Sequence, residues 1–96
     1  MQFVFFYLMS DKPDRVREVA ARHAAYWHEL ALDGYRGGPF ADRTGGLLTF
    51  EVATVDEADQ LVNADPFLRE GLLTRWWLRE WLPESAEPTP SLAGRP

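Results

Sequence analysis

The sequence predicts one small α+β domain in which an antiparallel sheet is covered by helices. Three observations support this fold class. The chain has 96 residues, a length that rarely divides into two domains. Segments with strand-like apolar density alternate with segments that carry helix-start signals. The four Trp, six Phe and three Tyr form a large apolar load that must be buried in little volume.

The first expected strand, Gln2–Met9, is apolar on both faces. Alternate side chains point to opposite faces, and the two sets are Phe3, Phe5, Tyr7 and Met9 on one face and Val4, Phe6 and Leu8 on the other. One layer of helices covers only one face of a sheet. We therefore expect a homodimer packed sheet against sheet, because a monomer would expose an unusually large apolar patch.

A long helix is expected next, from Ser10–Pro13 to about Asp33–Gly34. Ser10 and Asp11 are cap candidates, and Pro13 suits the first helical turn. A buried stripe at helical spacing supports this helix, and its members are Val16, Ala20, His23, Trp27 and Leu30. Gly34 is a suitable C-terminal stop.

A hairpin should follow the helix. Tyr35–Phe40 contains two Gly and one Pro, so it predicts a short or edge strand, or alternatively an ordered loop. Ala41–Gly46 has the composition of a turn, and Leu47–Ala53 is an apolar strand with alternating faces.

The second half of the chain repeats the pattern of helix and strand. Thr54–Glu57 fits a capping box before a shorter helix, and Asp65–Phe67 opens a helical turn that ends at Gly71. Leu72–Leu82 is apolar and aromatic, which favours a last strand, with a helix as the alternative.

The resulting order of strand, helix, strand, strand, helix, strand is the ferredoxin-like βαββαβ plan, a four-stranded antiparallel sheet with two helices on one face. We assign this domain to residues 1–83. Residues 84–96 lack apolar clustering and are expected to be a disordered, Pro-rich tail.

Composition excludes several classes of function. The formal charge of −5 would be repelled by phosphate backbones and anionic lipids, so we expect neither nucleic acid nor membrane as a partner. Gln2–Met9, the apolar N-terminal run, is too short to span a bilayer. The absence of cysteine removes disulfides, thiolate nucleophiles and cysteine-based metal sites, and it is typical of the reducing cytoplasm, where we expect the protein.

Two titratable residues occupy unusual positions. His23 lies in the middle of the apolar stripe, so its imidazole should face the sheet, either as a hydrogen-bonded core residue or as a functional group. His28 lies five residues on, roughly 140° further round the helix, and should be a surface residue. Metal-binding histidine pairs on helices are spaced i, i+4, so we expect no metal site. Asp65 should cap a helix, and a carboxylate fixed in this way could also orient a histidine.

A longer pattern carries a resemblance to a known family. Its members in order are His23, Gly34, Gly38-Pro39, Gly45-Gly46, Asp56-Glu57-Ala58, Asp65-Pro66-Phe67 and Gly71. From Gln2 to Leu82 the chain resembles the YCII-related (YciI-like) family. The resemblance implies a dimeric α+β barrel, the fold of muconolactone isomerases and small cofactor-free oxygenases. It also implies a catalytic His–Asp pair between helix and sheet, which corresponds to His23 and Asp65 here.

Two functions remain open. In the first, the protein is a small lyase or isomerase without cofactor or metal, similar to a family member that dehydrochlorinates hydroxylated aromatics. His23 would take a proton from a small cyclic substrate while Asp65 fixes its tautomer. The expected pocket walls, chosen for bulk, are Phe5, Tyr26, Phe40 and Trp76. In the second, the protein is a non-catalytic dimeric module that binds a small molecule or a partner, and the pair is a structural link.

Overall fold

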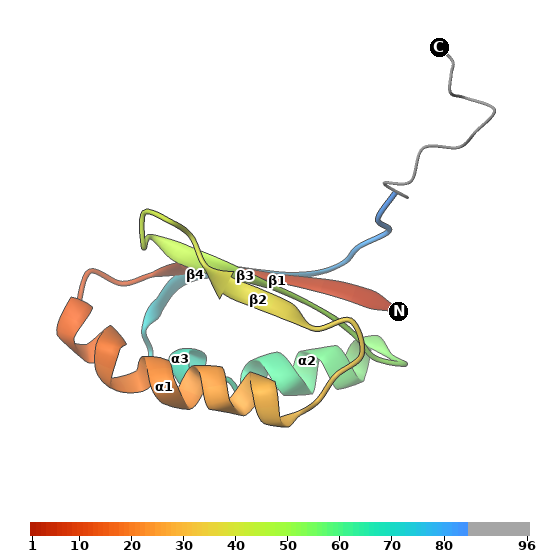
Figure 1. The fold of residues 1–96 in the computed structure, drawn as a ribbon, viewed down its shortest axis with the longest axis horizontal. Helices are drawn as coiled ribbons and strands as arrows, with labels where there is room; N and C mark the ends of the chain where they lie inside the picture. The colour runs from red at the N-terminus through yellow and green to blue at the C-terminus, as the bar shows by residue number, and fades with distance from the viewer. Residues whose placement is uncertain (85–96) are drawn as a thin grey trace, which may run out of the picture.

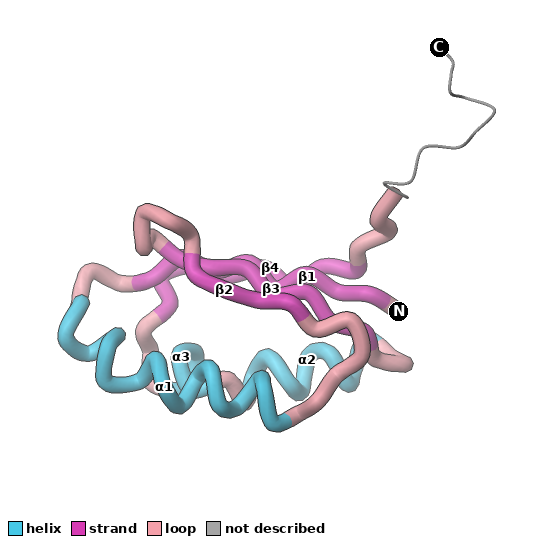
Figure 2. The backbone as a smooth tube through the Cα atoms, in the orientation of Figure 1, coloured by secondary structure: helices cyan, strands magenta, loops and turns pink. Residues whose placement is uncertain are grey.

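A computed structural model of the chain describes residues 1–84, and Figure 1 shows its arrangement in two layers. A sheet forms one layer and all the helices in these residues lie on one side of it (Figure 2). The disordered tail was predicted for residues 84–96, and from residue 85 onward this segment lies outside the described residues. None of the helices in the described part has the length and apolar run needed to cross a bilayer.

Four antiparallel strands build the sheet in the order β2-β3-β1-β4. Their bounds are Gln2–Met9 for β1, Arg36–Pro39 for β2, Gly45–Glu51 for β3 and Leu73–Glu80 for β4. Because β1 is central, Phe5 pairs with Leu48 of β3 on one side and with Leu78 of β4 on the other. The topology confirms the predicted ferredoxin-like α+β fold and settles two alternatives, since β2 is a short edge strand and β4 is a strand.

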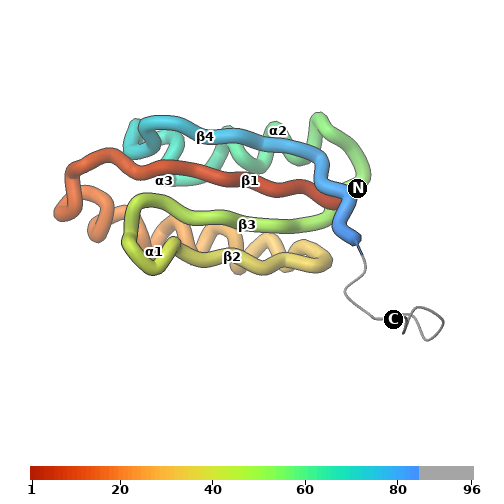
Figure 3. Tube along the Cα trace, turned by 90° about the horizontal axis from the view of Figure 1, so that it is seen from above, coloured from red at the N-terminus to blue at the C-terminus, as the bar shows by residue number. Residues whose placement is uncertain are grey.

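Three helices cover one face of the sheet, with α1 spanning Pro13–Glu29, α2 Val55–Asn63 and α3 Pro66–Arg69. Seen from above, α1 runs along the β2 and β3 side of the sheet and α2 along the β4 side (Figure 3). Thr54 caps α2, its hydroxyl accepting from the Glu57 N–H, as the capping box predicts. Asp65 caps α3 by accepting from the Phe67 N–H.

The structure corrects the predicted extent of two elements. Helix α1 ends at Glu29 rather than near Asp33, because the left-handed Ala31, with φ of 49°, turns the chain toward the sheet. Strand β3 begins at Gly45 rather than Leu47 because both glycines pair with β1. A side chain on Gly46 would collide with the Tyr7 hydroxyl, so the lack of a Cβ is what lets the pairing extend.

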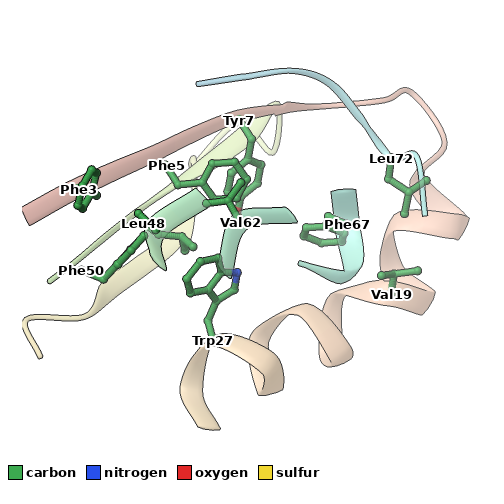
Figure 4. Close-up of a cluster of buried hydrophobic side chains, with 11 residues drawn as sticks. Phe3, Phe5, Tyr7, Val19, Trp27, Leu48, Phe50, Val62, Phe67 and Leu72 are labelled. Carbon is green, nitrogen blue, oxygen red and sulfur yellow. The ribbon is translucent and has the colours of Figure 1, made fainter. Parts of the chain in front are cut away.

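The core lies between the sheet and the helices (Figure 4). The inward residues of β1, which are Phe3, Phe5 and Tyr7, are buried as the alternation predicts. On α1, His23 and Trp27 are buried as predicted. At the start of the helix, the fully buried residue is not one of those predicted. Val19 is fully buried while Val16 and Ala20 are half-buried, because that end of the helix borders a cavity.

The opposite face of the sheet keeps its apolar character. Val4, Phe6 and Leu8 of β1 are half-buried, and Phe6 contacts the rings of Phe40 and Trp77. Arg75 lies over the Trp77 ring at 4.9 Å from its centroid. This face fits the physical argument for a sheet-to-sheet homodimer, which stays a prediction.

Candidate active site

His23 and Asp65, which are 42 residues apart in the chain, form a hydrogen-bonded pair between α1 and the start of α3. Their Nδ1 and Oδ1 atoms are 2.9 Å apart. The Asp65 side chain is fully buried, whereas that of His23 is 11% exposed. The helix therefore aims the imidazole into the molecule, and only a small part of the side chain is exposed.

The carboxylate of Asp65 is held by two further donors. Trp27 Nε1 donates to Oδ2 at 2.8 Å, and the Phe67 backbone N–H donates to Oδ1 at 2.7 Å. Three donors compensate the buried negative charge and fix the plane of the carboxylate. A carboxylate oxygen accepts hydrogen bonds, so His23 Nδ1 is the donor in this contact, and Nε2 is the ring nitrogen left to accept one.

The other side of the imidazole faces Tyr7 of β1. The Tyr7 hydroxyl is 3.3 Å from His23 Nε2. Burial raises the pKa of the Tyr7 phenol far above its ordinary value, and the negative charge of Asp65 raises it further. The phenol therefore stays protonated at neutral pH and can donate to Nε2. Phe67 stacks on the imidazole, with ring centroids 4.2 Å apart.

A cavity of about 360 Å³ opens beside this pair, between the first half of α1 and the β2–β3 hairpin. His23, Tyr7 and Phe67 form part of its wall, and Tyr35 and Arg43 lie on its hairpin side. The volume suits a small molecule of one ring. Burial raises the pKa of Tyr35, as does the charge of Asp65, so this second phenol is also protonated at neutral pH.

Glycines in the hairpin make room for these phenols. A Cβ on Gly46 would collide with the Tyr7 hydroxyl, and one on Gly37 would crowd the Tyr35 hydroxyl. Both glycines belong to the paired strands β2 and β3, so the hairpin backbone comes close to the aromatic rings. This part of the cavity wall therefore depends on the absence of two side chains.

The four aromatic residues expected as pocket walls lie elsewhere in the described structure. Phe5 is fully buried in the core. Tyr26 donates its hydroxyl to the Leu61 carbonyl at 2.6 Å, and Phe40 packs on the outer face of the sheet. Trp76 lines a separate depression beside β4.

Sequence reasoning missed most of the wall, including its polar side chains Tyr7, Tyr35 and Arg43. The alternation in β1 placed Tyr7 on the helix-covered face, and that signal could have identified it. Nothing local identifies the other two, because they depend on how the hairpin folds over α1. His28 is exposed, as expected. Among residues 1–84, no group of three or more acidic or histidine side chains is placed to hold a metal ion.

The two-layer α+β fold defines a class of protein, and the comparison with protein families agrees with it. The family model of the YCII-related domain matches residues 1–82, so the chain belongs to the YCII-related family. A comparison with curated protein sequences finds no match.

Two solved structures place the fold among known proteins. One is the 5-chloro-2-hydroxyhydroquinone dehydrochlorinase TftG of Burkholderia phenoliruptrix AC1100, in complex with 2,5-dihydroxybenzoquinone. It is 26% identical, with a TM-score of 0.71 over 85% of this chain and 94% of that chain. The other, Rv0793 of Mycobacterium tuberculosis, is 20% identical, with a TM-score of 0.54 over 88% of this chain and 97% of that chain.

Proposed function

We propose that the protein is a small lyase or isomerase that works without a cofactor on a hydroxylated ring, with His23 as general base and Asp65 as its positioning partner. The observation that carries the proposal is the 2.9 Å contact between His23 Nδ1 and Asp65 Oδ1 beside a cavity that His23 lines. A histidine, an orienting carboxylate and a cavity together form the arrangement that general base catalysis requires. The similarity to a dehydrochlorinase supports the choice of substrate class.

The chemistry needs the removal of one proton, the delivery of a proton to a ring carbon and a shift of electrons within the ring. His23 Nε2 takes the proton of a ring hydroxyl or of an activated ring carbon, and the electron pair left behind moves into the ring. In an elimination, the ring carbon that bears the halide first gains a proton and becomes tetrahedral. The electron pair of a deprotonated ring hydroxyl then moves into the ring and expels the halide with its bonding pair, so that hydrogen halide is lost overall. In an isomerisation, the proton returns to another carbon. Asp65 stabilises the imidazolium in both cases, and the Tyr7 hydroxyl must give up its place at Nε2 when the substrate arrives.

The proposal includes a homodimer formed through the outer face of the sheet. Val4, Phe6 and Leu8 supply the apolar surface, and Trp81 just beyond β4 is 43% exposed. Burying these side chains between two sheets would remove them from water. Light scattering at micromolar concentration should return twice the chain mass. A monomer at that concentration would contradict this part of the proposal.

Replacing His23 tests the catalytic role directly. We expect His23→Ala to lower kcat/KM for chloride release from chlorinated hydroquinones by about 10²–10⁴-fold, the usual contribution of a positioned general base. His28→Ala is the matched control, because this exposed histidine is on the same helix and away from the cavity. Turnover by His23→Ala at the parental rate would contradict the mechanism.

One observation favours the alternative of a non-catalytic binding module. Asp65 is bonded by Trp27 and by the Phe67 N–H even without His23, so it has a structural role of its own. Destabilisation by Asp65→Asn therefore cannot separate the two functions. His23→Ala can separate them. A structural pair predicts that this variant loses much of its thermal stability and that the parent protein turns over no hydroxylated ring.

A further inference from the structure

The wall of the cavity beside His23 differs in charge from the rest of the molecule. The chain carries 15 acidic and 10 basic side chains. Among the described residues that line the cavity there is no Asp or Glu, and Arg43 is the one side chain with a permanent charge. Asp65 lies behind His23 and is fully buried, and its charge is compensated by three donors. The cavity wall is therefore basic in an acidic protein.

Arg43 also lacks an acidic partner within residues 1–84, where the ion pairs involve other arginines. The adjacent carboxylate, Asp42, is engaged by Thr44 instead, accepting from its N–H at 3.0 Å and from its hydroxyl at 2.7 Å. Arg43 thus lines the cavity, and within residues 1–84 its guanidinium has no hydrogen-bond or acidic partner. Arginine in this state recognises planar anions well, because its fork of N–H groups matches two acceptor oxygens.

Arg43 also has an unusual backbone conformation. Its φ of 65° lies in the left-handed region, which glycine and asparagine adopt more easily than arginine does. The turn holds it there, because the Arg43 N–H donates to the Phe40 carbonyl at 2.9 Å and the Met9 N–H to the Thr44 carbonyl at 2.8 Å. An unfavourable residue kept at a strained position next to a cavity points to a role beyond the turn.

We propose that Arg43 is the anion-binding residue of this cavity and that the ligand is a small planar ring carrying a negative charge, a phenolate or a ring carboxylate. The inference rests on the proposed function in placing the ligand beside His23. The aromatic wall of Tyr35 and Phe67 takes the ring, and Arg43 takes the charge. The same cation stabilises the electron pair that moves into the ring when His23 accepts a proton.

Direct binding to the full chain tests this assignment with three probes. Calorimetry would use 2,5-dihydroxybenzoquinone as the acidic phenol, benzoate as the carboxylate and 1,4-dimethoxybenzene as the neutral ring. We expect Arg43→Gln to weaken binding of the anionic probe by about tenfold or more, as loss of a charge-assisted hydrogen bond does. Neutral-ring binding should not change, and Arg43→Lys should keep part of the anion affinity.

Two controls make the result decisive. Arg36→Gln removes an exposed arginine of the same hairpin that does not line this cavity and should bind all probes like the parent. Arg43→Asn suits the left-handed backbone, so its melting temperature should equal or exceed the parental value while anion affinity falls. Calorimetry with 2,5-dihydroxybenzoquinone and with benzoate shows whether the site binds a phenolate or a carboxylate.

The proposal is overturned if Arg43→Gln binds both anions as the parent does, if the parent prefers the neutral ring, or if no probe binds the parent at millimolar concentration. Anion binding by His23→Ala separates the two claims. If that variant binds anions normally while its turnover equals the parental rate, the catalytic proposal fails and the assignment of Arg43 stands.

Discussion

The two halves of the space between α1 and the sheet are built differently, although they share one carboxylate. Around Trp27 the space is filled, because this side chain is fully buried and packs on Phe50 and Tyr35. One turn earlier, at His23, it opens into the cavity. Asp65 joins the halves, with Oδ2 accepting from Trp27 and Oδ1 from His23. The filled half supplies stability, and the open half leaves space beside His23.

The largest effect should come from emptying the filled half. We expect Trp27→Ala to lower the free energy of unfolding by about 3–5 kcal/mol, because it leaves a large cavity in a packed aromatic core. Trp27→Phe keeps an aromatic ring at this position and removes the N–H donated to Asp65, so a smaller loss of about 1.5–3 kcal/mol is expected. Urea denaturation measures both. A loss below about 1 kcal/mol for Trp27→Ala would remove the distinction between the halves.

A smaller effect should appear in the open half when the pH is raised. The pKa of Tyr7 in the folded chain is raised above its ordinary value of 10.0 by burial first and by the charge of Asp65 second. Above pH 10 the unfolded chain loses this proton while the folded chain keeps it. Stability present below pH 10 is therefore lost as the pH rises toward the folded pKa.

Tyr7→Phe removes this titration and should make the alkaline fall of unfolding free energy shallower. Near pH 7 the same variant should lose about 0.5–1.5 kcal/mol, the worth of one hydrogen bond. Tyr26, whose pKa is also raised by burial, remains and keeps part of the pH dependence. Parallel stability curves for parent and variant from pH 8 to about pH 11 would contradict the buried, protonated state of Tyr7.

Local signals in the sequence predict the fold and the separate positions of His23 and Asp65, whereas the pairing of these two residues is implied only by the resemblance to the YCII-related family. Helical spacing alone aimed His23 at the sheet, and the cap-then-Pro signal fixed Asp65 at a helix start. The alternation of side chains in β1 correctly predicts that Phe3, Phe5 and Tyr7 face the helices.

The wall of the cavity could not be predicted because it depends on contacts far apart in the chain. The pairing of Gly46 with Tyr7 and the left-handed backbone of Arg43 both follow from how the hairpin meets β1. The size of an aromatic side chain did not predict whether it lines the cavity, since Phe5 packs into the core and Phe40 lies on the outer face of the sheet. Element order is thus local information, whereas a binding surface is a product of tertiary pairing.

The central claim is that Asp65 holds His23 with its proton on Nδ1 and leaves Nε2 as a free base at the cavity. Long-range ¹H–¹⁵N correlation spectra of the imidazole at neutral pH test this directly, with His28→Ala simplifying the assignment. We predict a protonated Nδ1 and an unprotonated Nε2 that accepts a hydrogen bond. A proton on Nε2 in the resting protein would contradict the account, because the cavity would then lack a base.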